Sequence, residues 1–322
     1  MVERIPFACA CIVALSLVSG TSARAEDVIP RWAYPIAPPG TPVPPDDGTV
    51  RRVPGSTAGF TLTELRDLFE ARDWFPGGHP AMPPIVAHGR KPDIRACGVC
   101  HRPEGTGGPE NAVLAGLPKA YVLRQIADFK AGTRSLAVKE RAHQLRMIAA
   151  VGGLTEAEAE AAATYYAGLK PAKVIKVIES ATVPKTVVPN WYFSLAPEGG
   201  SEPLGDRIVE VPDDPERFID RDYRVTFTAW VPPGSVARGA ELVAGRTDRA
   251  PACSACHGDD LRGTDTIPPI AGRSPSYLMR QLWEFKTGIR HGAEADAMRE
   301  NTRNLSVADM TAIVAHLATL DP

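Results

Sequence analysis

The chain has 322 residues with 36 basic and 38 acidic side chains, a formal net charge of −2 at pH 7. Nucleic-acid binding usually demands a basic face, so this balance argues against that class of function. The length is ample for two small domains, each with a core of its own.

Residues 1–25 predict a secretory signal peptide. Arg4 lies near the start, an apolar stretch runs from Ile5 to Val18, and Ala23-Arg24-Ala25 is a small-residue cleavage site. A membrane anchor needs about 18 or more apolar residues, and this stretch is shorter. We therefore expect a mature chain of 297 residues in the periplasm, without a transmembrane anchor.

Two C-x-x-C-H motifs occur in the chain: Cys97, Cys100 and His101 form the first, and Cys253, Cys256 and His257 form the second. Two thiols on one helical turn can each bind a vinyl group of one haem, and the adjacent histidine reaches the iron. Zinc knuckles or redox-active dithiols are the alternatives, but neither explains the histidine in both motifs. The motifs predict two covalently attached haem c groups, held by the four cysteines, with the two histidines as iron ligands.

An internal repeat relates the two motifs. A shift of 156 residues superposes them and matches further identical residues: Tyr121, Arg124, Gln125, Phe129 and Arg134 fall on Tyr277, Arg280, Gln281, Phe285 and Arg290. Beyond these the second copy is five residues shorter, and Met147 falls on Met298. Each half is expected to be one haem domain, the first over 60–171 and the second over 235–322.

Helices are expected around each motif. Tyr121, Gln125 and Phe129 recur every four residues and so share one helix face. Three Ser/Thr–acid pairs have the spacing of capping boxes, which open helices: Thr61 with Glu64, Thr155 with Glu158, and Ser306 with Asp309. The first pair predicts a helix from Thr61 to Phe75, and Ser235 is expected to cap a helix that runs through Val243.

Two segments lie outside the repeat. Residues 26–59 contain eight prolines and predict an extended arm on the surface or against a partner. Residues 172–234 are expected to form a connector with a few short strands packed between the haem domains. Its β-branched and aromatic runs are Val174–Ile178, Trp191–Leu195, Arg207–Val211 and Arg224–Val231.

The sixth ligand of each iron is expected to be a methionine, because a thioether favours reduced iron. Met147 and Met298 are the only mature-chain methionines that align in the repeat. Met279 and Met310 are expected to be packing residues. For the first haem three alternatives stay open, Met82, His79 and His88, which lie in an insertion before Cys97.

Together these residues resemble the class I c-type cytochromes, specifically the tandem di-haem type. The resemblance rests on the haem motifs, the Ala-Gly pair ahead of the Tyr/Gln/Phe helix, the methionine before the last capped helix, and the duplication. It implies a mainly α fold, with two class I cytochrome c-like helical haem domains joined by the small strand-containing connector. It also implies that a proline carbonyl accepts the N–H of each proximal histidine. Pro268 or Pro269 suits this role, whereas the first half has Ala112-Val113 there.

The function expected from this resemblance is that of a periplasmic di-haem carrier of single electrons between redox partner proteins, a donor dehydrogenase and an acceptor oxidase or cytochrome. With both irons six-coordinate, no catalytic residue and no enzymatic activity are expected. Two alternatives stay open: a cytochrome subunit of a periplasmic dehydrogenase complex, and a di-haem enzyme of peroxidase or small-oxyanion-oxidising type. The sequence does not identify the donor, the acceptor, the potentials, the pathway or the oligomeric state.

Overall fold

A computed structural model describes residues 1–2 and 28–322 of the chain. All but the first two residues of the expected signal peptide therefore lie outside the described residues. Within the described part, every helix is too short or too polar to cross a membrane.

The first half is helical around its haem motif. Its elements are α1 (Leu62–Leu65), α2 (Pro84–Ala87), α3 (Cys97–His101), α4 (Lys119–Ala131), α5 (Ala142–Gly152) and α6 (Glu156–Ala167). Helix α6 begins at the capping box of Thr155 and Glu158, as predicted, and α4 ends at Gly132, whose φ of +74° is left-handed. Helices α4 and α6 pack on each other around an apolar cluster that includes Val122 and Tyr166.

The second half repeats this arrangement. Its elements are α8 (Ser235–Val243), α9 (Ser254–His257), α10 (Pro275–Lys286), the 3-10 turn η2 (Ala293–Ala295), α11 (Asp296–Thr302) and α12 (Val307–Thr319). The predicted capping box of Ser306 and Asp309 opens α12. Helix α8 ends at Val243 as expected, but Gly234 takes the N-cap position in place of Ser235.

The connector forms small sheets. Strands β1 (Ile175–Glu179), β7 (Phe227–Val231) and β6 (Val209–Pro212) make a three-stranded sheet in that order, β1 parallel and β6 antiparallel to β7. Two antiparallel pairs lie beside it: β2 (Thr182–Pro184) with β5 (Ser201–Pro203), and β3 (Thr186–Val187) with β4 (Ser194–Leu195). The larger sheet packs on α12 and α10 and shares their apolar core. Helix α7 (Pro215–Ile219) and the residues after it reach the first half, where Arg221 Nε donates to the Leu65 carbonyl at 2.7 Å.

The arm links the two halves. It begins with the 3-10 turn η1 (Arg31–Ala33), and Ala33 and Tyr34 are buried in the core of the second half. Farther along, Asp46 accepts from the backbone N–H of Thr63 at the start of α1. The described part of the arm therefore belongs to the folded body, with Ala33 and Tyr34 in the core and Val43 and Val50 exposed on the surface.

The predicted helix from Thr61 to Phe75 is wrong. The capping box of Thr61 and Glu64 is present, but α1 ends at Leu65. Two aspartates beyond it bind backbone N–H groups two residues on, Asp67 that of Phe69 at 2.8 Å and Asp73 that of Phe75 at 2.9 Å. Such Asx turns compete with helix formation, which explains why the helix stops after one turn.

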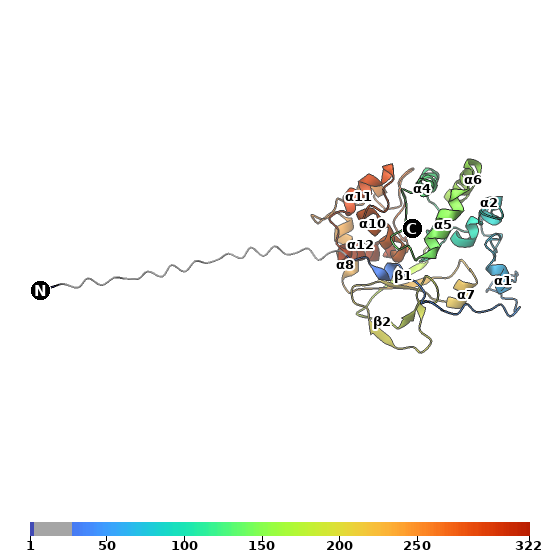
Figure 1. Ribbon diagram of the computed structural model, residues 1–322, viewed down its shortest axis with the longest axis horizontal. Coiled ribbons are helices and arrows are strands. Elements are labelled where there is room, and N and C mark those ends of the chain that lie inside the picture. The colour runs from blue at the N-terminus through green and yellow to red at the C-terminus, as the bar shows by residue number, and fades with distance from the viewer. Residues whose placement is uncertain (3–27) are drawn as a thin grey trace.

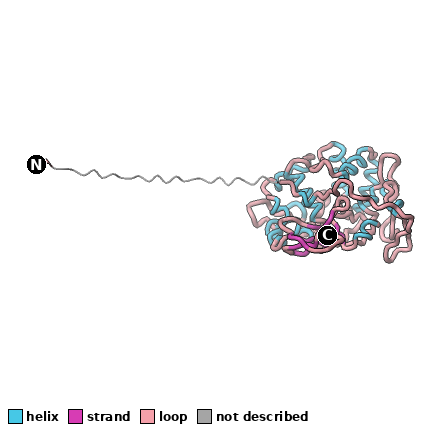
Figure 2. Tube along the Cα trace, turned by 60° about the horizontal axis from the view of Figure 1, so that its bottom comes forward, coloured by secondary structure: helices cyan, strands magenta, loops and turns pink. Residues whose placement is uncertain are grey.

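Figure 1 shows the helices α10, α11 and α12 on one side of the body and α4, α5 and α6 on the other, with β1, β2 and α7 below them. In Figure 2 the strands gather in one small region among helices and loops. The predicted fold class is confirmed: the chain is mainly α, with two helical haem domains and a small strand-containing connector.

Candidate haem sites

The first motif lies on α3 and faces a cavity with largely apolar walls. Cys97, Cys100 and His101 line this cavity, together with residues of α4, α5 and α6 such as Ile126 and Tyr166. His101 is buried, its Nδ1 lies 2.9 Å from the Ala112 carbonyl oxygen, and burial lowers its pKa. The imidazole is therefore neutral with its proton on Nδ1, which leaves the Nε2 lone pair for a metal.

The second motif repeats this geometry. Cys253, Cys256 and His257 line a second cavity beside α9, α10 and α11. His257 is buried, its Nδ1 lies 2.7 Å from the Pro268 carbonyl oxygen, and burial lowers its pKa. Both histidines are thus held by a backbone carbonyl in the tautomer that a ligand to iron needs.

The expectation of a proline carbonyl is confirmed for Pro268. In the first half Ala112 takes the same role, so the absence of a proline there does not remove the hydrogen bond. A carbonyl oxygen needs only to be placed eleven residues after the histidine, and both loops place it there.

A methionine lines each cavity as well. Met147 on α5 lines the first and Met298 on α11 lines the second. Met279 and Met310 are fully buried in the apolar core of the second half, as expected of packing residues.

The three alternatives for the first haem lie elsewhere. Met82 packs against the apolar cluster of the first half and is not among the residues that line the cavity. His88 is exposed and its Nδ1 lies 2.9 Å from Glu70, while His79 Nε2 lies 3.0 Å from Asp73. This placement favours Met147 over Met82, His79 and His88 as the sixth ligand of the first haem iron.

The two cavities share a wall. Five side chains line both of them: Leu117, Tyr121, Gln125, Tyr277 and Gln281. Four of these come from the predicted helix faces of α4 and α10, which meet between the cavities. One layer of side chains therefore separates the two haem sites.

Hydrogen bonds from repeated arginines join the halves. Arg134 donates to Gln125 at 3.0 Å, to Gln281 at 2.8 Å and to Tyr277 at 3.2 Å. Arg290 makes the mirror set, to Gln281 at 3.1 Å, Gln125 at 2.6 Å and Tyr121 at 2.9 Å. The contact is thus pseudo-symmetric, because each half presents the same residues to the other.

A second repeated pair also crosses the interface. Arg124 Nη2 donates to the Thr266 carbonyl at 2.8 Å, and Arg280 Nη2 donates to the Pro109 carbonyl at 2.6 Å. The repeat shows that Arg124 and Arg280 are equivalent positions in the sequence. It does not show that each of them contacts the other half.

Each cavity also has a buried arginine with no hydrogen-bond partner on Nε, Nη1 or Nη2 among the described residues. Arg141 lines the first cavity and Arg273 the second, and they are 2% and 4% exposed. Burial lowers the pKa of Arg141 to about 9 and that of Arg273 to about 10. Burying a cation without a partner costs folding free energy. Each guanidinium therefore indicates that an anion binds in its cavity.

Sequence reasoning missed Arg141 and Arg273. They do not align in the repeat, so no pattern separated them from the other arginines of the chain. Only their burial against a cavity identifies them.

The residues fit haem c in each half. Two thiols and a neutral imidazole stand on one helical turn, apolar side chains and a methionine line the cavity, and the unpartnered guanidinium matches a haem propionate. The cofactor is therefore two covalently attached haem c groups.

Sequence comparisons with known proteins agree with two haem c groups. Residues 236–321 match the family model described as cytochrome c, so that region is a cytochrome c domain. Cytochrome c4 of Azotobacter vinelandii is 25% identical over 229 residues, covering 70% of this chain and 84% of the relative. The thiosulfate dehydrogenase electron acceptor of Thiomonas intermedia is 26% identical over 233 residues, covering 70% of this chain and 79% of the relative. The crystal structure of reduced recombinant cytochrome c4 from Pseudomonas stutzeri aligns with a TM-score of 0.45 at 23% identity, over 70% of this chain and 93% of that one.

Proposed function

We propose that this chain, which is a tandem di-haem cytochrome of the class I c type, relays single electrons through both haem sites between a periplasmic dehydrogenase and an acceptor protein. It is an electron-transfer protein, and a bound haem c supplies a one-electron iron couple.

The wall that the two cavities share is the observation that supports electron transfer between the two haems. Five side chains line both cavities, and the hydrogen bonds of Arg134 and Arg290 hold this wall in place. Leu117, Gln125 and Gln281 are buried, and the glutamines and the two tyrosines are hydrogen-bonded to the arginines, so the wall keeps the spacing of the two sites constant.

Rapid one-electron reduction of the oxidised protein tests the relay. An electron that enters one haem is expected to redistribute between the two at a rate independent of protein concentration. A rate that rises in proportion to protein concentration would mean that electrons pass between molecules, and the relay would be rejected.

We further propose that Met147 and Met298 complete the ligand sets begun by His101 and His257. Support comes from their places on the lining of the two cavities and from the positions of Met82, His79 and His88 outside the first. With a methionine sulfur as the sixth ligand of each iron, neither iron would have an open coordination position, and the protein would have no enzymatic activity of its own. Carbon monoxide should then bind the reduced protein slowly or not at all near neutral pH. Rapid stoichiometric binding at one haem would favour the enzyme alternative.

The electron donor is proposed to be a dehydrogenase that oxidises a small sulfur oxyanion. The Thiomonas relative is named as the electron acceptor of thiosulfate dehydrogenase, and its match covers 70% of this chain. Oxidised protein mixed with catalytic thiosulfate dehydrogenase and thiosulfate should become reduced, whereas omission of the enzyme should leave it oxidised. Failure of reduction, with a standard acceptor reduced in parallel, would reject this donor. Co-purification of a dehydrogenase at native expression would instead favour the subunit alternative.

The periplasm is the proposed compartment, because residues 1–25 have the pattern of a signal peptide and haem c is attached after export. The mature protein should begin at Glu26. Intact-mass measurement of protein purified from a periplasmic extract checks this start. A mass that includes residues 1–25 would contradict it.

A further inference from the structure

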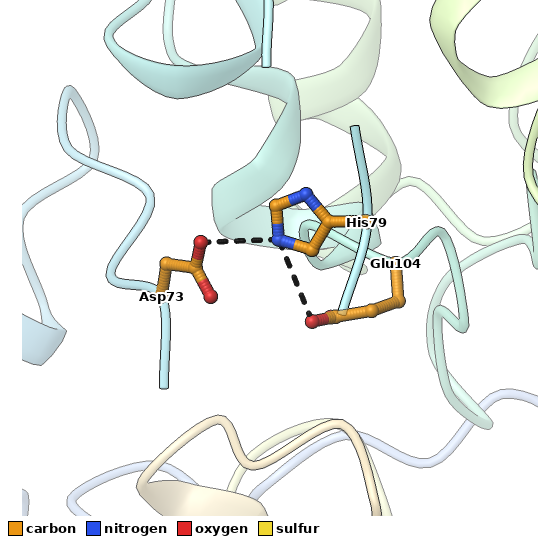
Figure 3. Close-up of side chains that lie close together, drawn as sticks. All are labelled: Asp73, His79 and Glu104. Carbon is orange, nitrogen blue, oxygen red and sulfur yellow. Dashed lines mark hydrogen bonds and ion pairs between the residues drawn. The ribbon is translucent and has the colours of Figure 1, made fainter. Parts of the chain in front are cut away.

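A cluster of two carboxylates and one histidine lies beside the first haem domain. Asp73, His79 and Glu104 each offer one ligand atom, and the three atoms lie within 4.8 Å of one another. Figure 3 shows the His79 ring between the two carboxylates, with one ring nitrogen turned toward both. The site lies apart from the haem cavity, since none of the three residues lines it.

The ring nitrogens of His79 have distinct roles. Nδ1 lies 2.8 Å from the Pro80 carbonyl oxygen, which only accepts, so Nδ1 carries a proton. It also lies 3.0 Å from the Tyr165 hydroxyl, whose own proton goes to the Pro103 carbonyl at 2.8 Å. Nε2 is therefore the free nitrogen, and a histidine ligand to metal usually has this arrangement of a carbonyl behind it.

Nε2 faces two oxygen atoms that also lack a donor of their own. It lies 3.0 Å from Asp73 Oδ2 and 3.7 Å from Glu104 Oε1. Glu104 is 9% exposed, and neither of its carboxylate oxygens has a hydrogen-bond partner among the described residues. Burial, and then the charge of Asp73, raise the pKa of Glu104 to about 8. A cation at this point would satisfy all three groups.

The separations suit a small metal ion. Donor atoms about 2.0–2.1 Å from a tetrahedral zinc ion are about 3.3 Å from each other. The two distances from Nε2 lie on either side of this value. A nitrogen donor with two carboxylates favours a first-row transition metal over Ca²⁺ or Mg²⁺, which prefer oxygen ligands alone.

We propose that Asp73, His79 and Glu104 bind one divalent transition-metal ion of the zinc type, with solvent completing the coordination. Asp73 lies in the segment after α1, His79 comes from the insertion ahead of the first motif, and Glu104 follows the motif by three residues. The ion thus ties the insertion to the haem domain. The second half, all of which is described, has no such group of three ligands.

Zinc binding to the mature protein, from Glu26 onward and with both haems attached, tests the proposal, since haem attachment consumes its four thiols, which would otherwise compete. The protein, without an affinity tag, is freed of metal by a chelator and titrated with zinc chloride. One zinc ion per chain is expected, and millimolar Mg²⁺ should not displace it. Glu104→Gln and His79→Gln should each weaken binding at least tenfold. A zinc-edge X-ray absorption spectrum should show imidazole and oxygen ligands and no sulfur.

His88→Gln is the matched control. His88 lies in the same insertion and also faces one carboxylate, Glu70, but at an exposed place without a third ligand. Its loss should leave zinc binding unchanged. Haem absorption shows whether each variant is folded, and Asp73→Asn, at the more exposed ligand, replaces any variant that is not.

Absence of stoichiometric zinc uptake by the wild-type protein would overturn the proposal, as would wild-type affinity in the folded variants.

Discussion

Arg134 and Arg290 form reciprocal hydrogen bonds across the pseudo-symmetric interface. Arg134 donates to Gln281 of the second half at 2.8 Å, and Arg290 donates to Gln125 of the first half at 2.6 Å. Their backbones form an isolated antiparallel bridge. Both guanidinium groups are buried, and both bind residues of the wall between the haem cavities. The stability of the chain and the geometry of its haem pair therefore depend on the same contacts.

Arg134→Gln should lower the free energy of unfolding by about 1.5–3 kcal/mol, the usual range for hydrogen bonds to a charged group. It removes the donor to Tyr277 and one of the two donors to each of Gln125 and Gln281, which keep their bonds from Arg290. Urea unfolding followed by circular dichroism measures the change. Arg303→Gln is the control, because Arg303 is exposed and pairs only with Glu300 on its own helix turn. Equal effects of the two substitutions would mean that the interface contributes little.

Met147→Ala should remove about half of the long-wavelength sulfur-to-iron absorption of the oxidised protein and lower one of the two potentials. Met298→Ala should do the same to the other haem. Met82→Ala should do neither, because Met82 packs outside the cavity. Absorption spectra and redox titration of the three variants give the result. If Met82→Ala alone abolished the band, the repeat would have misassigned the first ligand.

Arg141→Leu should lower the potential of the first haem alone, and Arg273→Leu that of the second alone. Each arginine lines only one cavity, and a nearby positive charge disfavours the more positive, oxidised haem. Redox titration of each variant measures both potentials. A change in both potentials from one substitution would show that the effect is not local. Arg246→Leu, on an exposed arginine paired with Glu241, should change neither.

Glu158 should stabilise the protein above about pH 5 and lose this effect in acid. The side chain of Arg90, and then the backbone N–H of Thr155, lower the pKa of Glu158 from 4.5 to about 2. A carboxyl whose pKa is depressed on folding contributes stability above its unfolded pKa, and the contribution disappears as the pH falls through the folded value. Glu158→Gln should therefore cost about 0.5–1 kcal/mol at pH 7, the range of an exposed ion pair, and almost nothing near pH 2.

Urea unfolding of the wild type and Glu158→Gln at pH 7, 4 and 2.5 checks this dependence. Glu160→Gln serves as the control, since Glu160 is on the same helix but more exposed and caps nothing. A cost that stays constant over this range would show that the carboxylate charge is not its source.

Local patterns in the sequence determined much of this protein. A C-x-x-C-H motif places its three groups on one helical turn, so the two haem c groups could be predicted without a fold, and the assignment of the four cysteines and two histidines to them stays a prediction. Capping boxes act over three residues, and the two at Thr155 and Ser306 open helices as predicted. The box at Thr61 did so as well, but the Asx turns of Asp67 and Asp73 ended the helix after one turn. The repeat matched the residues that form the interface but did not predict that they face each other, and the choice of Met147 and Met298 as ligands stays a prediction.

Only the tertiary structure decided which residues from distant parts of the chain meet. Arg141 and Arg273 lie at positions that do not correspond in the repeat, yet each is buried against a cavity. Asp73 and His79 reach Glu104 because the chain between α1 and the first motif folds back on the haem domain. The physical reason is that burial against a cavity, and contact across 25 residues or more, depend on how helices pack. Sequence spacing carries that information only for residues on one element or in one repeat.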